Sequence, residues 1–388
     1  MSEDIRVHGY CEDSFTPVKE AFAQNFRLGL EGGASFAATI DGKFIIDIWG
    51  GYADKAKTRS WEIDTIVNVF SSTKVMATIC TLMLVDRRQI DLDSPVAKYW
   101  PEFAQNGKET MPVRYLFSHS SGLAGFGELT THEKLYNWEY IVEMLAKQKP
   151  LWDPGTQSGY HGLTMGYLLG ELVKRITGKT IGKFFQDEVA KPFQAEFFIG
   201  LPAEYDSHVA EMIPAPELKP GDPGYDELDP ATIRGKVRLN QPLDHGVVNE
   251  TGWRRAEIPA ANGHGNARAM ARIGAAMACG GELDGIRLLS QETINKMIEE
   301  QTNGIDLVLL SPIRWGLGVE LSTPERPLSP NERSFSWGGA GGSMIVMDLD
   351  ARMSWAYAMN KMGYGPHFLE PRNRRVSEAF YNVLTKRG

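Results

Sequence analysis

The sequence predicts an α+β protein. We expect an α/β/α sandwich whose antiparallel sheet is formed by both chain ends and flanked by helices, with a mainly helical domain inserted in the middle. Two observations lead to this prediction: strand-like segments cluster near the two termini, and the segments between them carry helical periodicity. The chain has 388 residues, more than one core usually supports. We therefore predict a sandwich domain from residues 1–90 and 255–388 and an inserted helical domain from residues 91–254.

The N-terminal part of the predicted sheet is a hairpin. The sequence from Ala34 to Trp49 reads as two strands on either side of Asp41-Gly42, and Asp-Gly between such segments is a strong hairpin signal. A helix is expected just before it, over residues 18–28. This end of the chain therefore supplies one helix and two strands.

The C-terminal part of the predicted sheet is a second pair of strands. Residues 344–348 and 353–359 are apolar segments of strand length, joined by Leu349-Asp350-Ala351. The amphipathic stretch 373–384 that follows predicts a final helix. Both ends of the chain thus contribute strands to one sheet.

The middle of the chain is expected to be mostly helical. The periodic segments are 138–147, 163–177 (ending at Gly178) and 182–189. Residues 201–259 are rich in Pro, Gly and Asp and show little periodicity, so we expect long surface loops there, either bordering a pocket or without function. After them, Asn266 is the expected N-cap of a helix that continues to Met277.

Composition excludes several classes of protein. The chain is 42% hydrophobic and 23% charged, as is usual for a folded globular protein, and its net charge of −8 gives no reason to expect nucleic acid or an anionic membrane as a partner. The three cysteines are far apart and have no metal-ligand spacing, and Cys80 is expected in the core. No signal peptide or membrane-spanning segment is visible, so we expect a cytoplasmic protein. No oligomeric state follows from the sequence.

Ser71 and Lys74 are the most informative pair of residues. They lie three positions apart at the start of an apolar stretch that reads as a buried helix, so they share one helical face. An amine whose pKa is lowered by burial can take the proton of a serine hydroxyl, and the helix N-terminus favours developing negative charge. Such a pair can open an ester or amide. Taken alone, the same residues are equally well explained as an N-cap serine and a solvated lysine.

Three segments in a fixed order resemble a known family. Ser71-Ser72-Thr73-Lys74 is followed by Tyr160-His161-Gly162, 89 residues later (160 minus 71), and then by Trp337-Gly338-Gly339-Ala340, 177 residues beyond the tyrosine (337 minus 160). Together with residues 116–123 and 262–265, they resemble the serine β-lactamase and penicillin-binding-protein superfamily, and within it the family VIII carboxylesterases, which are class C β-lactamase-like esterases. The resemblance implies a β-lactamase/transpeptidase-like fold with the active site at the interface of the two domains.

The resemblance also implies roles for the residues of these segments. Ser71 is the expected nucleophile, and Lys74 and Tyr160 are expected to share the proton transfers. A lysine ammonium near a phenol would lower the pKa of the phenol. The backbone N–H groups of Ser71 and Ala340 are expected to form the oxyanion hole. Trp337, Gly338 and Gly339, on an expected edge strand, would contact substrate, as would His161.

Two departures from the family pattern bear on the substrate. Penicillin-targeting relatives commonly begin the third segment with a lysine that binds a substrate carboxylate, whereas Trp337 offers an apolar face. Those relatives carry an Asn that contacts substrate and lysine at the position of Gly162, which has no side chain to do either. Both departures favour neutral esters over anionic β-lactams, but they leave open what positions Lys74.

The sequence therefore predicts a serine carboxylesterase that hydrolyses short-chain, neutral acyl esters through an acyl-enzyme. Its expected partner is a small-molecule ester, and no cofactor or metal is expected, because no phosphate-binding loop or His/Cys cluster stands out. The alternatives are a β-lactamase or D-amino-peptidase, an acyltransferase, and a non-catalytic penicillin-binding-like protein. The proposed chemistry needs neither His161 nor His264 as a catalytic residue, and the resemblance places His119 in a loop that braces the fold. The absence of a Gly-x-Ser-x-Gly elbow argues against an α/β-hydrolase.

Overall fold

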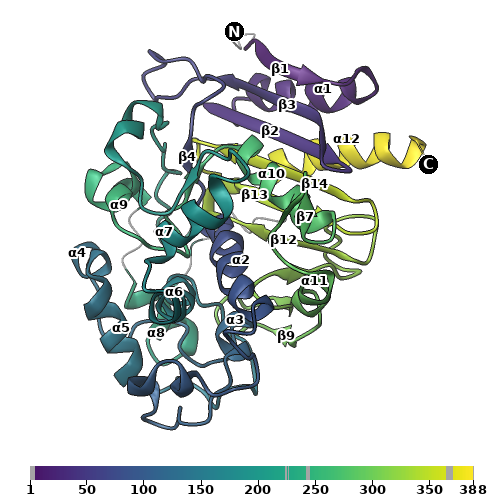
Figure 1. The fold of residues 1–388 in the computed structure, drawn as a ribbon. Helices are drawn as coiled ribbons and strands as arrows, with labels where there is room; N and C mark the ends of the chain where they lie inside the picture. The colour runs from purple at the N-terminus through teal and green to yellow at the C-terminus, as the bar shows by residue number, and fades with distance from the viewer. Residues whose placement is uncertain (1–4, 223–224, 226, 242–244, 364–369, 388) are drawn as a thin grey trace.

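A nine-stranded antiparallel sheet takes strands from both ends of the chain (Figure 1), as predicted. The structure is a computed structural model that describes residues 5–222, 225, 227–241, 245–363 and 370–387. The strand order is β1-β3-β2-β14-β13-β12-β11-β10-β9. The strands are β1 (Val7–Cys11), β2 (Gly33–Ile40), β3 (Lys43–Gly51), β9 (Thr302–Ile305), β10 (Pro312–Trp315), β11 (Glu320–Leu321), β12 (Ser334–Gly338), β13 (Met344–Asp348) and β14 (Met353–Met359).

The predicted turns of the sheet are confirmed. Asp41 and Gly42 join β2 to β3, and both have positive φ angles, 47° and 75°. A two-residue turn of this kind matches the right-handed twist of the strands it joins, which explains why Asp-Gly is found there. The strands β13 and β14 also have the predicted bounds.

Helices cover both faces of the sheet because successive side chains of its central strands point alternately into two cores. Along β14, Trp355 and Tyr357 belong to the core under α1 (Thr16–Arg27) and α12 (Pro371–Arg387), which pack against each other. Ala356 belongs to the other core, where α10 (Ala267–Ala278) packs on β2, β13 and β14. Side chains of successive strand residues point to opposite faces, so one strand supplies both layers.

Most of the remaining helices are drawn below the sheet in Figure 1, with α2 (Thr73–Asp86) between them and the sheet. The division of the chain into a sandwich domain (residues 1–90 and 255–388) and an inserted helical domain (residues 91–254) stays a prediction. The predicted helix 182–189 consists of α7 followed by a π-helical turn. The other helices are α3 (Arg114–Phe117), α4 (His132–Tyr136), α5 (Trp138–Lys147), α6 (Thr164–Thr177), α7 (Ile181–Phe185) with the π turn (Gln186–Ala190), and α11 (Gln291–Met297).

The expectation of long loops over residues 201–259 is only partly correct. The segment contains α8 (Ile233–Leu239) and α9 (Thr251–Arg255), with 3₁₀ turns at Ala203–His208 and His245–Asn249. Helices of five to seven residues contain fewer than two turns, so the apolar positions do not recur often enough to predict them from the sequence. Part of the segment, residues 223–224, 226 and 242–244, lies outside the described residues.

Three small features complete the fold. The short strands β4 (Val67–Asn68), β6 (His264–Gly265) and β5 (Phe197–Phe198) form a second sheet beside the start of α2. The strands β7 (Glu282–Leu283) and β8 (Ile286–Arg287) form a hairpin after α10. Within the described residues, no helix combines the length and the apolar character needed to cross a bilayer.

Candidate active site

Ser71 lies in a tight turn that leads into α2. A 3₁₀ turn, Phe70–Ser72, precedes the helix, and Phe70 has a φ angle of 45°, which is unfavourable for a residue with a side chain. Strain of this kind costs about 1–3 kcal/mol and persists only where the surroundings enforce it. Here the Val69 N–H donates to the Gly263 carbonyl (2.8 Å), and the Val69 carbonyl accepts from Ser343 Oγ (2.6 Å). The turn leaves Ser71 partly exposed, while its neighbours on both sides are buried.

The structure brings together the three side chains that the sequence singled out. Lys74 Nζ lies 3.0 Å from Ser71 Oγ, and the Tyr160 hydroxyl donates to the same oxygen at 2.6 Å. Lys74 is fully buried, whereas Tyr160 is partly exposed. A hydroxyl in contact with an amine and a phenol has the arrangement of a nucleophile with its acid and base groups.

Backbone carbonyls position Lys74. Its Nζ donates to the carbonyls of Gly162 and Ala260, both at 2.8 Å. Burial lowers the pKa of Lys74 well below its usual value. A neutral amine has two N–H donors and one lone pair, so when both carbonyls are satisfied the lone pair is left for the hydroxyl of Ser71. Gly162 thus contacts the lysine through its main chain, which the sequence did not predict, and Ala260 carried no recognisable signal.

The expected lowering of the pKa of Tyr160 is wrong. Burial raises the pKa of its phenol to about 12, although the hydrogen bonds with Ser71 and Trp337 oppose the shift. The expectation assumed a charged lysine near the hydroxyl, but Lys74 Nζ lies 4.9 Å from the centre of the Tyr160 ring and its own pKa is lowered. Tyr160 is therefore a protonated phenol over the ordinary pH range.

The end of β12 lies against the nucleophile turn. The expectation of an edge strand is wrong for the sheet as a whole, because β12 lies between β11 and β13. The partner strand β11, however, pairs only with Phe335 and Ser336, so the segment from Trp337 onwards has a neighbouring strand on one side only. An added Cβ at Gly339 would lie 2.2 Å from the Val69 carbonyl oxygen, so the close approach requires glycine.

The Ser71 and Ala340 backbone N–H groups are candidates for an oxyanion hole. Ala340 is partly exposed and directly follows the segment that touches Val69. Among the hydrogen bonds within the described part of the chain, neither N–H donates to a protein acceptor. Both donors therefore remain available to a substrate oxygen.

Trp337 forms an aromatic wall beside the three central side chains. It is 3% exposed, its ring centre lies 5.7 Å from Lys74 Nζ, and its ring packs 6.2 Å from that of Tyr160. Trp315 stacks on it at 5.2 Å. The two stacked indoles make this wall apolar.

The geometry does not support the expected contact between His161 and substrate, because the side chain is buried and both ring nitrogens already have protein partners. His161 is fully buried, its Nε2 is 2.6 Å from Ser121 Oγ, and its Nδ1 is 2.6 Å from the Gly159 carbonyl. Burial lowers its pKa to about 3, and the pKa of His264, which is equally buried, falls to the same value. Both are therefore neutral imidazoles inside the protein, and the chemistry expected of Ser71 uses neither.

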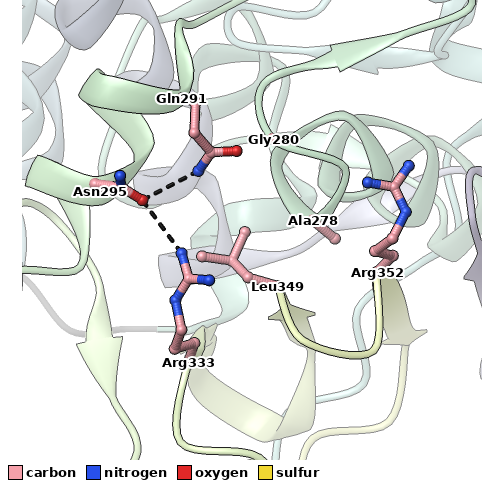
Figure 2. Close-up of a pocket in the computed structure, with 7 residues that line it drawn as sticks. All are labelled: Ala278, Gly280, Gln291, Asn295, Arg333, Leu349 and Arg352. Atoms are coloured by element: carbon pink, nitrogen blue, oxygen red, sulfur yellow. Dashed lines mark hydrogen bonds between the residues drawn. The ribbon is translucent and has the colours of Figure 1, made fainter.

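The surface cavity drawn in Figure 2 lies elsewhere, at the opposite end of β12. It measures about 270 Å³, and its two arginines, Arg333 and Arg352, are paired with Asp350 and Asp41. No residue of the candidate site lines it. Within the described residues there is also no group of His, Cys, Asp and Glu that could hold a metal. The cavity is lined by Ala278, Gly280, Gln291, Asn295, Arg333, Leu349 and Arg352.

Comparisons with known proteins agree with this geometry. A family profile described as Beta-lactamase matches residues 22–379. The chain belongs to the β-lactamase family. It is 34% identical to the esterase/beta-lactamase LipL of Mycobacterium tuberculosis, over 92% of this chain and 83% of that protein. The predicted membership of the superfamily is thereby confirmed.

Solved structures give the same result. A family VIII carboxylesterase matches with a TM-score of 0.90 and 39% identity, covering 97% of this chain and 100% of the other. A penicillin-binding protein homologue from Caulobacter crescentus matches with a TM-score of 0.89 and 36% identity, at the same coverage of both chains. The predicted resemblance to family VIII carboxylesterases and the predicted β-lactamase/transpeptidase-like fold are confirmed. The chain is a serine hydrolase of the esterase/β-lactamase type.

Proposed function

We propose that this protein is a carboxylesterase that hydrolyses short-chain, neutral acyl esters through an acyl-enzyme on Ser71. One observation carries the proposal: Ser71 Oγ lies 3.0 Å from Lys74 Nζ and 2.6 Å from the Tyr160 hydroxyl, and it is partly exposed. The names of two relatives, a family VIII carboxylesterase and an esterase/beta-lactamase, support the same class of reaction.

Lys74 is the proposed base for acylation. Its lone pair takes the Ser71 proton as Oγ attacks the ester carbonyl carbon, and the N–H groups of Ser71 and Ala340 stabilise the oxyanion. When the tetrahedral intermediate collapses, the alcohol leaves with a proton from the Tyr160 hydroxyl. The phenolate then takes the proton held by Lys74, so both groups return to their starting states. Because the three groups titrate together, the assignment describes one route through a coupled system.

Deacylation follows the same route in reverse. Water takes the place of the alcohol, gives a proton to the Lys74 and Tyr160 pair, and attacks the acyl carbon. The oxyanion again lies against the N–H groups of Ser71 and Ala340, and Ser71 leaves with a proton. The product is a carboxylic acid, and an alcohol in place of water would give a new ester.

Trp337 is the proposed determinant of the preference for neutral esters. Its indole forms an apolar wall where the penicillin-targeting relatives carry a cation. Gly338 and Gly339, the other proposed substrate contacts, are buried, and the partly exposed Ala340 follows them. A carboxylate-bearing substrate would lie against this wall without a charged partner, which disfavours its binding. Small neutral acyl esters carry no such penalty.

The direct test is hydrolysis of p-nitrophenyl butyrate by the wild type and by the Ser71→Ala variant. We expect the variant to lose turnover by at least about 1,000-fold, because it lacks the nucleophile. Mass spectrometry after reaction with a p-nitrophenyl phosphonate should place the adduct on Ser71 in the wild type. Full activity of Ser71→Ala, or labelling at another residue, would refute the assignment.

A slower β-lactamase activity is the second candidate, because one relative at 34% identity is named an esterase/beta-lactamase. Comparing kcat/KM for a chromogenic cephalosporin with that for the butyrate ester decides between the two. We expect the ester to be preferred. Product analysis with added alcohol tests acyltransfer, and intact-mass measurement after mixing with an ester would reveal a stable adduct if the protein did not turn over.

A further inference from the structure

Tyr160 lies in a segment without regular secondary structure, so other groups must hold it in place. Residues 157–161 have neither helical nor strand hydrogen bonding. The backbone N–H groups of three consecutive residues are nevertheless all taken. The Gly159 N–H donates to the His119 carbonyl at 2.9 Å, the Tyr160 N–H to Asp306 Oδ1 at 2.9 Å, and the His161 N–H to His119 Nδ1 at 3.1 Å.

We propose that His119 and Asp306 are positioning residues that together hold the Tyr160 hydroxyl on Ser71. The inference rests on the proposed function, in which Tyr160 donates a proton to the leaving group. It assigns a role to two buried side chains that the proposed chemistry does not use directly. Neither residue contacts Ser71, so both act through Tyr160.

His119 reaches both neighbours of Tyr160 because of its unusual backbone. Its φ angle is 58°, in the left-handed region that side chains other than Gly, Asn and Asp rarely occupy. In this conformation one residue presents its carbonyl to Gly159 and its ring to His161. Strained backbone is found where the surrounding structure enforces it, and often at functional sites.

The His119 ring must be neutral to play this part. Its Nδ1 accepts a hydrogen bond, so the ring proton is on Nε2, and burial lowers the pKa of the imidazole well below its usual value. Nε2 is buried and makes no hydrogen bond to the described residues. The ring is instead enclosed by aromatic side chains, edge-on to Tyr160 at 5.3 Å and to Trp315 at 4.5 Å, with Trp337 at 5.4 Å.

Asp306 fixes Tyr160 through the N–H group of Tyr160 itself. It is fully buried, and its Oδ1 accepts from the N–H groups of Tyr160, Val308 and Leu309, each at 2.9 Å. Its Oδ2 accepts from Trp315 Nε1 at 3.4 Å, and Trp315 stacks parallel to the Tyr160 ring with centres 6.3 Å apart. Asp306 therefore holds both the backbone of Tyr160 and the indole on which the phenol lies.

A matched pair of variants tests the His119 half of the proposal. Asn tolerates the left-handed backbone and places Oδ1 where His119 has Nδ1, so His119→Asn keeps the acceptor, whereas His119→Gly keeps the backbone and loses the acceptor. We expect kcat for p-nitrophenyl butyrate to fall about 100-fold in His119→Gly, with KM within about threefold, and to stay within about tenfold in His119→Asn. Wild-type kcat in His119→Gly, or equal losses in both variants, would overturn the proposal.

A double-mutant cycle separates positioning of Tyr160 from a general structural role. In a Tyr160→Phe background the phenol is absent, so removing its support should cost little more, and we expect His119→Gly to lower kcat less than threefold there. Additive losses would overturn the proposal. Tyr167→Phe is the benchmark for lost stability, because it removes a buried hydrogen bond to Leu135, and it should leave kcat unchanged.

A second matched pair of variants tests the role of Asp306, and it remains decisive for the proposal if His119→Gly does not fold. Asp306→Asn keeps the Oδ1 acceptor and Asp306→Ala loses it, so we expect kcat to be at least tenfold higher in the Asn variant. Equal kcat values in the two would overturn this half. Failure of the proposed function would appear separately, as a wild type that neither hydrolyses the ester nor is labelled at Ser71 by the phosphonate.

Discussion

Gly339 is where the geometry makes its sharpest prediction. A Cβ at this position would lie 2.2 Å from the Val69 carbonyl oxygen and 2.2 Å from Ser343 Oγ. A carbon and a carbonyl oxygen in contact are normally about 3.3 Å apart, so Gly339→Ala requires about 1 Å of separation. Ser343 cannot turn away freely, because its Oγ holds the Val69 carbonyl at 2.6 Å. The end of β12 must therefore move away from the nucleophile turn.

The expected cost has two parts. Moving β12 carries the adjacent Ala340 N–H away from the Ser71 hydroxyl, and a 1 Å displacement of catalytic groups costs about 100-fold in rate, so kcat for p-nitrophenyl butyrate should fall by about that factor. Overpacking a buried contact costs about 1–3 kcal/mol of stability, which urea unfolding measures. Gly127→Ala is the control, because its Cβ would meet Gln148 at an ordinary 3.4 Å. A Gly339→Ala variant with wild-type kcat and stability would refute the reasoning.

Three further predictions concern ionisation and packing. Burial lowers the pKa of Lys74, so kcat/KM should rise with pH as Lys74 loses its proton and reach its plateau well below pH 10.5. Burial raises the pKa of Tyr160 to about 12, so kcat/KM should not fall up to pH 10. A fall near pH 8 would contradict the assignment. Arg372→Met should cost about 3–5 kcal/mol in urea unfolding, because it leaves the buried Glu31 and Glu370 without their partner, and an unchanged stability would contradict this reading. Trp337→Lys should raise kcat/KM for an anionic cephalosporin relative to the ester, and an unchanged ratio would show that the indole does not set the preference.

The fold was largely predictable because its elements have strong local signals. Asp41-Gly42 requires two positive φ angles, which those residues tolerate, and the apolar segments at both ends have the length of strands. The short helices α8 and α9 were missed because five to seven residues make fewer than two turns, too few for a helical repeat to be recognised. Their formation depends on packing against the rest of the protein, which no local pattern encodes.

The side chains of the candidate site were predictable, but their protonation states were not. Ser71, Lys74 and Tyr160 each stand in a recognisable segment, and the structure brings them into contact. The pKa of Tyr160 depends on burial and on how Lys74 is held, which are properties of the folded protein. Ala260 contributes only a main-chain carbonyl, and any residue can supply one, so no sequence signal could have identified it.

Lys74 is held in place by main-chain carbonyls. In the penicillin-targeting relatives that the sequence resembles, one Asn side chain serves both substrate and lysine, so changing it alters recognition and catalysis together. Here two backbone carbonyls, those of Gly162 and Ala260, hold the amine, and a backbone carbonyl survives substitution of its side chain. In the proposed mechanism, the groups that hold Lys74 are therefore independent of the side chains at these two positions. Trp337 takes no part in this hold, but its ring centre lies 5.7 Å from Lys74 Nζ and its ring packs against Tyr160, so a change in the aromatic wall would act on the proposed base and acid as well as on substrate.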